Sequence, residues 1–302
     1  MESYAAELRT RLSEWEVRYA RTPSEERRLV TDAQIATGIG IDEALLDRAT
    51  NLELFATVYA GTDHLPMDRL AERGVRVTNA SGVHAPGIAE QILGNILVFT
   101  RRLHEGWRRK QNREWRHFQG HELTDSTVTI IGLGSIGKAF VQRLDGMEVE
   151  TIGVRYTPAK GGPTDEVIGF DEREFHDALA RTDYLVVSCP LTETTSGLID
   201  AEAFATLPPH VVLVNVARGE IVDTEDLTAA LRNGSIRGAA LDVTDPEPLP
   251  QDHPLWSLEN CLITPHIGGY TPKHWSRLAD IVAHNADRLD SDSDLQNLVL
   301  QP

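Results

Sequence analysis

Three polar residues follow separate apolar runs, and their types suit chemistry at a carbonyl beside a carboxylate. Arg218 follows VVLVNVA, Glu247 follows GAALDVTDP and His266 follows CLITP. An arginine can hold the carboxylate and polarise the carbonyl, and a histidine can protonate the alkoxide that reduction creates. A glutamate bonded to the other ring nitrogen would orient the histidine and keep it protonated near neutral pH. Together the three types are those needed to reduce a 2-oxo acid.

Each of these residues also has an ordinary structural explanation when it is taken alone. A single arginine is usually part of a surface ion pair, a single glutamate is usually solvated, and a histidine in Thr-Pro-His often belongs to a turn. Their shared placement after strand-like runs is what favours a site. In an open α/β sheet the carboxyl ends of the strands line one crevice, so we expect the three side chains to converge there.

A glycine-rich turn, GLGSIG at residues 132–137, lies between the strand-like run TVTII and the helical run SIGKAFVQRL. In this context Gly132 would make the tight turn, Gly134 would let the backbone approach a pyrophosphate, and Gly137 would let the helix pack closely. The phosphates would lie at the unpaired N–H groups that begin the helix. We therefore predict a dinucleotide site rather than a plain glycine turn.

The strand after this helix ends in VETIGV and continues into Arg155, Tyr156 and Thr157, without an acidic residue. An acid near this point accepts hydrogen bonds from the adenosine ribose in NAD-binding proteins. Arg155 could instead pair with a 2′-phosphate and stack on adenine, and Thr157 could add a hydroxyl donor. We predict NADPH as the preferred cofactor. NADH remains the alternative, in which Arg155 points to solvent and an acid elsewhere binds the ribose.

Strand-like runs alternate with helical patterns along most of the chain, which predicts two doubly wound Rossmann-like or flavodoxin-like α/β domains with parallel sheets. Early strand candidates are residues 34–39 and 52–61, and Asp42 is the expected N-cap of the helix between them. The final amphipathic helix is expected to return to the first domain. We place the dinucleotide-binding domain at 93–269, the substrate domain at 1–92 plus 270–302, and the active site in the cleft between them.

Composition narrows the protein class. The 302 residues include 29 Lys and Arg against 46 Asp and Glu, and the net charge of −17 argues against nucleic acid or anionic membrane as a partner. No apolar run is long enough to span a bilayer, and the N-terminus lacks the apolar core of a signal peptide. Cys189 and Cys261 lie in strand-like runs and are expected to be buried thiols. We predict a cytoplasmic protein that is adapted to high salt.

With these motifs in view, nearly the whole chain resembles the D-isomer-specific 2-hydroxyacid dehydrogenase family. The resemblance is carried by GLGSIG, LVVSCPLTETTSGLI, LVNVARGEIVD, GAALDVTDPEPLP and ITPHIGG. It implies reduction of small 2-oxo acids to D-2-hydroxy acids by Arg218, Glu247 and His266, without a metal, and it includes glyoxylate and hydroxypyruvate reductases. Formate dehydrogenases of the same superfamily carry Gln where Glu247 stands, so formate oxidation is not expected.

The resemblance also implies roles for other residues. Asp242 would bind the nicotinamide carboxamide, and the loop Tyr59-Ala60-Gly61 would hold the substrate carboxylate through the N–H groups of Ala60 and Gly61. The full set of expected cofactor contacts is Gly132, Gly134, Ser135, Ile136, Gly137, Arg155, Tyr156, Thr157, Cys189, Pro190, Thr195, Val216, Ala217, Asp242, His266 and Gly268.

A basic stretch at residues 101–117, which also holds Trp107 and Trp115, has three interpretations. It resembles the arm that forms a twofold homodimer in this family, it could be a solvated helix that packs within one chain, or it could be a nucleic-acid patch, which the acidic composition disfavours. His117 and His121 are spaced as on one helix face, but no third metal ligand is in view.

A second class of function also stays open. Some relatives in the superfamily are nicotinamide-sensing, corepressor-like binding proteins without significant turnover, and such proteins can keep the Arg, Glu and His set. Measured turnover would separate the two classes.

Overall fold

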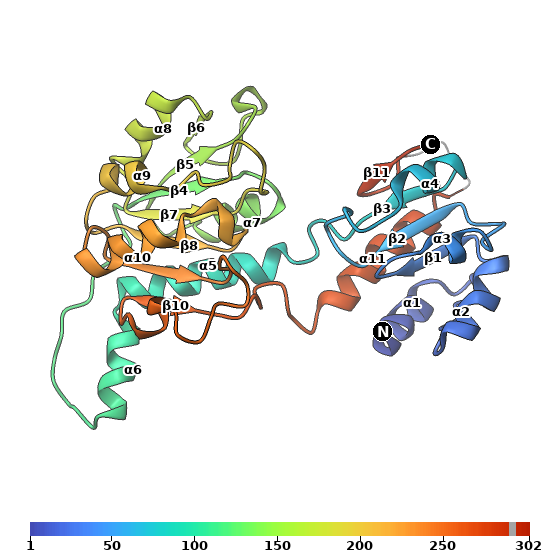
Figure 1. Ribbon diagram of the computed structural model, residues 1–302, viewed down its shortest axis with the longest axis horizontal. Coiled ribbons are helices and arrows are strands. Elements are labelled where there is room, and N and C mark those ends of the chain that lie inside the picture. The colour runs from blue at the N-terminus through green and yellow to red at the C-terminus, as the bar shows by residue number, and fades with distance from the viewer. Residues whose placement is uncertain (290–293) are drawn as a thin grey trace. The chain divides into compact units, whose positions relative to one another are not determined.

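The computed structural model describes residues 1–289 and 294–302, and contacts between residues divide the chain into two compact units. Unit 1 contains Met1–Val83 and Thr271–Pro302, and unit 2 contains His84–Tyr270. Each unit is an α/β structure built around its own sheet (Figure 1). These units divide at 83/84 and 270/271, whereas the sequence analysis placed the domain limits at 92/93 and 269/270.

Unit 1 has a four-stranded sheet whose order is β1-β2-β3-β11. The strands are β1 (Ile35–Gly38), β2 (Leu54–Thr57), β3 (Arg76–Thr78) and β11 (Leu298–Leu300). The first three pair in parallel, as expected, whereas β11 pairs antiparallel with β3 at the edge. The sheet is therefore parallel except for its last strand, which the sequence analysis did not anticipate.

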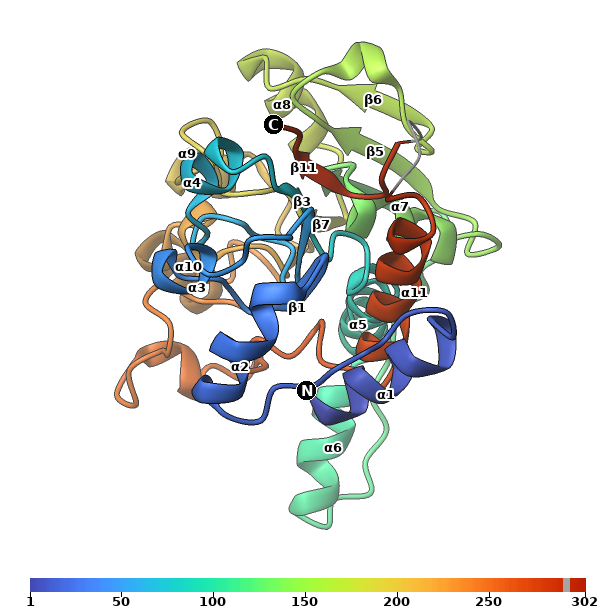
Figure 2. The same ribbon diagram turned by 90° about the vertical axis from the view of Figure 1, so that its right-hand side faces the viewer.

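Helices cover both faces of this sheet. The helices α1 (Glu2–Arg11) and α11 (His274–Ala286) lie side by side (Figure 2) and share a core with Ala56 and Val58 of the β2 segment. The short helices α3 (Glu43–Leu46) and α4 (Met67–Glu72) pack on the opposite face with Phe55, because side chains alternate along a strand. The remaining helices of unit 1 are α2 (Pro23–Leu29) and the 3₁₀ turn η1 (Val30–Asp32).

Two sequence expectations bear on these helices. The carboxylate of Asp42 accepts a hydrogen bond from the backbone N–H of Leu45 at 2.7 Å, which confirms it as an N-cap. The last helix of the chain, α11, packs against α1 in unit 1, to which we expected it to return.

Unit 2 has seven parallel strands in the order β10-β9-β8-β7-β4-β5-β6. They are β4 (Thr127–Ile131), β5 (Glu150–Val154), β6 (Glu166–Ile168), β7 (Tyr184–Val187), β8 (Val212–Asn215), β9 (Gly238–Leu241) and β10 (Cys261–Ile263). Every residue of β7, β8 and β9 is buried, as expected for parallel strands that are covered on both faces. All were expected from the sequence except β6, whose three residues form the edge.

The two faces of this sheet carry separate groups of helices. One core contains side chains of α5 (Ala85–Thr100) and α7 (Ser135–Arg143). The other contains side chains of α8 (Glu172–Leu179), α9 (Ala201–Thr206) and α10 (Thr224–Asn233). This confirms the doubly wound α/β class. Short 3₁₀ turns occur in the connecting loops as η2 (Pro158–Lys160), η3 (Gly219–Ile221) and η4 (Pro254–Ser257).

The helical pattern IAEQILGNILVFTRRLHEG at residues 88–106 does not form one continuous helix. Helix α5 ends at Thr100, and α6 (Leu103–Gln111) begins after Arg102, whose φ of 52° is left-handed and incompatible with a continuous helix. Figure 1 shows α6 and the loop after it projecting from the body of unit 2. His117 and His121 lie in that loop, so the helix face that they were expected to share does not exist.

No helix within residues 1–289 and 294–302 is long and apolar enough to cross a bilayer.

Candidate active site

The candidate residues of unit 2 lie along one edge of its sheet. Because all seven strands are parallel, their carboxyl ends meet at the same edge. Six neighbouring strands each contribute there, and from β10 to β5 the residues that follow them are His266, Asp242, Arg218, Cys189, Gly132 and Arg155. Residues that are far apart in the sequence therefore share one edge in a fixed order.

His266 and Glu247 form a hydrogen-bonded pair at the β9–β10 end of this edge. The distance from Nδ1 of the imidazole to Oε1 of the carboxylate is 2.7 Å. An ionised carboxylate only accepts hydrogen bonds, so Nδ1 carries the hydrogen and Nε2 is the nitrogen left for another partner. The two side chains are 49% and 43% exposed, which leaves the imidazole accessible to a small molecule.

His266 has a left-handed backbone conformation, with φ of 53°. Its N–H donates to the carbonyl oxygens of Asp242 and Thr264 at 2.8 and 3.0 Å. Positive φ is uncommon for residues other than glycine, so these two bonds hold the backbone in a conformation that it would not adopt freely. The imidazole therefore projects from a fixed turn.

Asp242 is a buried carboxylate, 3% exposed, that is saturated with donors on one side. Its Oδ1 accepts from Thr264 Oγ1 at 2.5 Å, Gln91 Nε2 at 2.9 Å and the N–H of Ile267 at 3.0 Å. Its Oδ2 accepts from the N–H of Gly268 at 2.8 Å. The sequence analysis missed Gln91, which lies in no motif, and Thr264, which lies in ITPHIGG beside the residue to which the chemistry was assigned, His266.

Arg218 is exposed, but its backbone is held tightly. The buried side chain of Asn215 donates to the carbonyl oxygen of Arg218 at 2.9 Å and accepts from the N–H of Ala217 at 3.0 Å. A Cβ on Gly219 would lie 2.1 Å from the carbonyl carbon of Thr244, so only glycine lets this loop pass the loop after β9. Asn215 was not among the expected residues, although a polar residue inside the buried run LVNVA was a usable signal.

The glycine-rich turn has the geometry that its motif predicts. Gly132 has φ of 102°, and a Cβ there would lie 2.6 Å from the backbone nitrogen of Cys189. A Cβ on Gly137 would lie 2.1 Å from the carbonyl oxygen of Gly132, so the third glycine brings α7 against the turn. A Cβ on Gly134 would meet nothing within 4 Å.

The start of α7 fits a phosphate group. Gly134 is its N-cap and has no side chain to accept hydrogen bonds from the N–H groups of the first turn, which includes Ser135 and Ile136. The open space at Gly134 lies beside these donors, and the helix dipole favours an anion there. Of the expected cofactor contacts, this group is the one whose local geometry matches a dinucleotide most directly.

The expected contacts that follow β7 and β8 line the middle of the edge. Cys189, Val216 and Ala217 are each 6% exposed, and Thr195 is 4% exposed. The hydroxyl of Thr195 donates to the carbonyl oxygen of Pro190 at 2.7 Å, which closes the loop on itself. Burial raises the pKa of the Cys189 thiol to about 11, so it is a neutral packing group at physiological pH. Both Cys189 and Cys261 are free, as the sequence predicted.

Arg155 lies at the β5 end of the edge and is half-buried. Its Nη1 donates to the carbonyl oxygen of Gly161, in the loop that leads to β6. Tyr156 and Thr157 are exposed beside it. One guanidinium nitrogen is thus fixed by the protein at the position where the sequence predicts contact with the adenosine end of a cofactor.

The expected substrate loop lies in unit 1, after β2. The carbonyl oxygen of Ala60 accepts from Asn79 Nδ2 at 2.7 Å, and that of Tyr59 accepts from the N–H of Ala80 at 3.0 Å. Within residues 1–289 and 294–302, the N–H groups of Ala60 and Gly61 donate to no acceptor. The carbonyl oxygens of Tyr59 and Ala60 therefore fix the loop, and the N–H groups of Ala60 and Gly61 point to no acceptor among the described residues.

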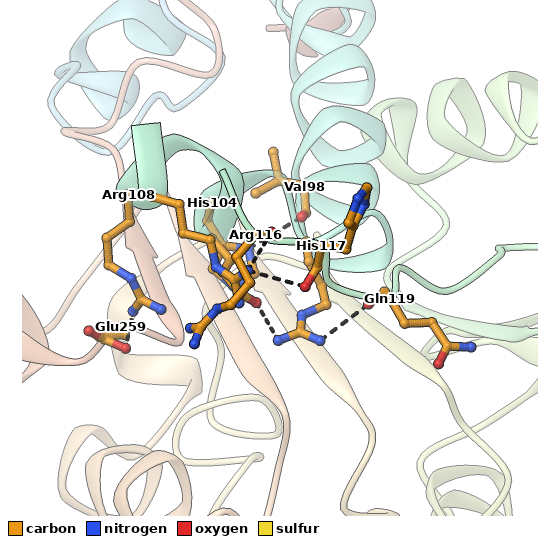
Figure 3. A network of polar contacts seen from close by, with 10 residues as sticks. Val98, His104, Arg108, Arg116, His117, Gln119 and Glu259 are labelled. Carbon is orange, nitrogen blue, oxygen red and sulfur yellow. Dashed lines mark hydrogen bonds and ion pairs between the residues drawn. The ribbon is translucent and has the colours of Figure 1, made fainter. Parts of the chain in front are cut away.

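Part of the basic stretch around α6 is paired within unit 2 (Figure 3). Arg108 forms an ion pair with Glu259, and Arg109 donates to the carbonyl oxygen of Arg116 at 2.7 Å. Glu105 is buried and pairs with both Arg102 and Arg109. Arg102, Arg108 and Arg109 are therefore paired with carboxylates, whereas Arg113 and Arg116 are exposed.

Metal binding receives no support from the geometry. Among the residues that the structure describes, no three His, Cys, Asp or Glu side chains are grouped so that they could hold a metal ion.

A doubly wound sheet with a glycine-rich turn, together with Arg, Glu and His on the same edge, defines the class of nicotinamide-dependent oxidoreductases. Residues 93–268 match the family model of the D-isomer specific 2-hydroxyacid dehydrogenase, NAD binding domain. The chain is also 39% identical over 254 residues to the glyoxylate reductase/hydroxypyruvate reductase of Mus musculus, covering 81% of this chain and 76% of that protein. The chain belongs to the D-isomer-specific 2-hydroxyacid dehydrogenase family, whose members are NAD(P)-dependent oxidoreductases acting on CH–OH groups.

Solved structures agree with this assignment. A D-isomer specific 2-hydroxyacid dehydrogenase family protein from Aeromonas salmonicida matches with a TM-score of 0.82 and 27% identity, over 100% of this chain and 97% of that chain. A D-isomer specific 2-hydroxyacid dehydrogenase from Xanthobacter autotrophicus Py2, in complex with NADPH and MES, matches with a TM-score of 0.81 and 27% identity, over 99% and 94%.

Proposed function

We propose that this enzyme reduces small 2-oxo acids to D-2-hydroxy acids with NADPH as the preferred reductant, using Arg218, Glu247 and His266. The observation that carries the proposal is the 2.7 Å bond between His266 and Glu247 on the edge that also carries Arg218 and the glycine-rich turn. The curated relative from mouse, a glyoxylate reductase/hydroxypyruvate reductase, supports glyoxylate and hydroxypyruvate as substrates to test first.

Each of the three side chains has a distinct part in the reaction. The nicotinamide ring, when bound, supplies the hydride. Arg218 pairs with the substrate carboxylate and polarises the adjacent carbonyl. Nε2 of His266 donates the proton to the oxygen that becomes the hydroxyl, and Glu247, bonded to Nδ1, stabilises the protonated imidazole and fixes its orientation.

We further propose that the substrate carboxylate is held by the N–H groups of Ala60 and Gly61. Two adjacent backbone donors without acceptors suit a carboxylate, which accepts several hydrogen bonds.

The proposed function is tested by following NADPH and NADH oxidation with a panel of 2-oxo acids of increasing chain length. Turnover that yields the D-2-hydroxy acid supports it. If both cofactors bind but no 2-oxo acid is reduced, a corepressor-like binding protein becomes the better interpretation and the enzymatic proposal fails.

Arg155 is expected to set the preference for NADPH, because its guanidinium lies at the end of β5 and can pair with a 2′-phosphate. Arg155→Gln should raise the KM for NADPH about tenfold or more, the range of a lost hydrogen bond to a charged group. The KM for NADH should change little, since NADH has no 2′-phosphate. An equal rise for both cofactors would show that Arg155 only supports the loop through Gly161.

We also propose adaptation to high salt. A net charge of −17 implies strong self-repulsion among carboxylates, and about 1 M salt reduces the screening length to roughly 3 Å. The Tm should therefore rise as KCl is added, whereas a neutral osmolyte at matched osmolarity serves as the control. A Tm that does not change with KCl would contradict salt adaptation and would indicate an ordinary acidic protein.

A homodimer formed through α6 and the loop after it is a further part of the proposal. Trp107 and Trp115 are 66% and 97% exposed, and such large apolar side chains are typical of protein interfaces. Sedimentation equilibrium should give a dimer for the native protein and a smaller species after Trp115→Ala with Trp107→Ala. A native monomer would contradict this.

The two free thiols suit a reducing cytoplasm, the location that we propose.

A further inference from the structure

We infer that Gln91 is a positioning residue for the reaction, because it holds the buried carboxylate of Asp242 in the orientation that receives the nicotinamide end of the cofactor. Gln91 lies on α5, a helix that carries none of the expected catalytic or cofactor-binding residues. The inference rests on the proposed function, because it assigns Gln91 to the same site.

Gln91 connects α5 to two loops. One follows β9 and contains Asp242, and the other follows β10 and contains Thr264 and His266. Its Nε2 donates to Asp242 Oδ1 at 2.9 Å and to Thr264 Oγ1 at 3.0 Å. The hydroxyl of Thr264 in turn donates to the same Oδ1 at 2.5 Å. One amide group thus connects a helix, the loop after β9 and the loop after β10.

These bonds fix which oxygen of Asp242 is free to act. Oδ1 accepts three hydrogen bonds, from Gln91, Thr264 and the N–H of Ile267. Within the described ranges, Oδ2 accepts only from the N–H of Gly268. A carboxylate oxygen has about two lone pairs, so Oδ1 is fully occupied and Oδ2 retains acceptor capacity. Gln91 therefore sets the carboxylate so that Oδ2 can accept an amide N–H from the nicotinamide end of the cofactor.

The hydrogen bonds of Asp242 also hold the backbone around His266, the proposed proton donor. The N–H groups of Ile267 and Gly268, directly after His266, are bound by the Asp242 carboxylate, and the N–H of His266 is bound by the Asp242 carbonyl oxygen. If Gln91 loses its amide, Oδ1 keeps only the donors Thr264 and Ile267, and the carboxylate is held less firmly against rotation about its Cβ–Cγ bond. The left-handed turn at His266 would then be held less firmly, although Gln91 touches neither the imidazole nor the substrate.

A purely structural role makes a different prediction. If Gln91 only packs α5 against the sheet, its replacement by a side chain of similar volume lowers the Tm and leaves the kinetics of the folded enzyme unchanged. If it positions the site, kcat and cofactor recognition change even where the Tm does not.

The test uses Gln91→Met, which keeps the length of the side chain and removes its amide group. The matched control is Glu90→Gln on the same helix turn, whose carboxylate is largely exposed and lies 3.5 Å from Arg143. Steady-state kinetics are measured with NADPH and with its 3-acetylpyridine analogue, in which a methyl ketone replaces the carboxamide and removes its N–H. The Tm of each variant is measured in parallel.

We expect Gln91→Met to lower kcat/KM with NADPH about tenfold, as for a lost hydrogen bond to a charged group. The loss should be smaller with the analogue, because the analogue cannot donate to Asp242 in either enzyme. Glu90→Gln should behave as wild type.

Three outcomes would overturn the inference: unchanged kinetics in Gln91→Met, equal losses with the two cofactors, or an equal effect of Glu90→Gln. If Gln91→Met does not fold, Thr264→Val removes another donor to Oδ1 and should show the same difference between cofactors; equal losses there also reject the inference. Absence of turnover in the wild-type enzyme would instead reject the proposed function itself.

Discussion

His266→Gln is expected to lower kcat by about 10²- to 10⁴-fold, the range that a positioned general acid contributes. Glutamine can still donate a hydrogen bond, but it cannot release a proton to the new hydroxyl. The dissociation constant for NADPH should stay close to that of wild type, because the glycine-rich turn and Arg155 lie at other strands of the sheet. Steady-state turnover and fluorescence titration of the cofactor check the two parts separately.

Glu247→Gln provides the companion variant to this experiment. It keeps the size of the side chain and removes the negative charge that pairs with Nδ1 of His266. Its effect on kcat should be smaller than that of His266→Gln, since the proton donor itself remains. If His266→Gln turns over at nearly the wild-type rate, His266 is not the general acid of the reaction.

Arg218→Ala is expected to lower kcat/KM by about 10²- to 10³-fold, comparable to the loss of one donor that stabilises a developing oxyanion. Because the guanidinium serves both the bound substrate and the transition state, KM should rise and kcat should fall together. The measurement is a full saturation curve for the best 2-oxo acid at saturating NADPH.

A suitable control for this variant is Arg232→Ala, which removes an exposed arginine from the end of α10 in the same unit. It should leave both parameters unchanged. If Arg218→Ala raises KM alone, Arg218 contributes to substrate binding and not to the chemical step.

The sequence predicts the core of unit 2 well because its central strands are continuous apolar runs that end in recognisable motifs. β7 and β8 are buried at every position, and their parallel pairing places Cys189 and Arg218 on one edge without further information. Short edge strands are harder to predict. β6 has only three residues and includes the partly exposed Glu166, so it lacks a clear apolar pattern.

The break between α5 and α6 was missed for a related reason. The break contains neither glycine nor proline. The left-handed conformation falls on Arg102, and arginine is not a residue type that predicts a turn. The local environment after Thr100 decides this conformation, including the bond from the N–H of His121 to the carbonyl oxygen of Thr100 at 2.7 Å. That contact joins residues distant in the chain and has no sequence signature.

The candidate site shows the same division. Arg218, Glu247 and His266 were found because their residue types carry chemistry. Asn215 and Gln91 act only through hydrogen bonds to other site residues, so their contribution becomes visible only when the atoms are placed. Sequence reasoning therefore proposes residues whose side chains carry chemistry and tends to miss residues that only hold others in place.

The strand order of the unit 2 sheet also gives the distances between the candidate residues along its edge. Neighbouring strands lie about 4.8 Å apart, so the three intervals from β5 to β8 separate Arg155 from Arg218 by roughly 14 Å along the edge. Sites that far apart, without shared partners, usually contribute independently to free energy. Cofactor preference at one end could thus be redesigned without loss of the chemistry at the other, and the two sets of substitutions should combine additively.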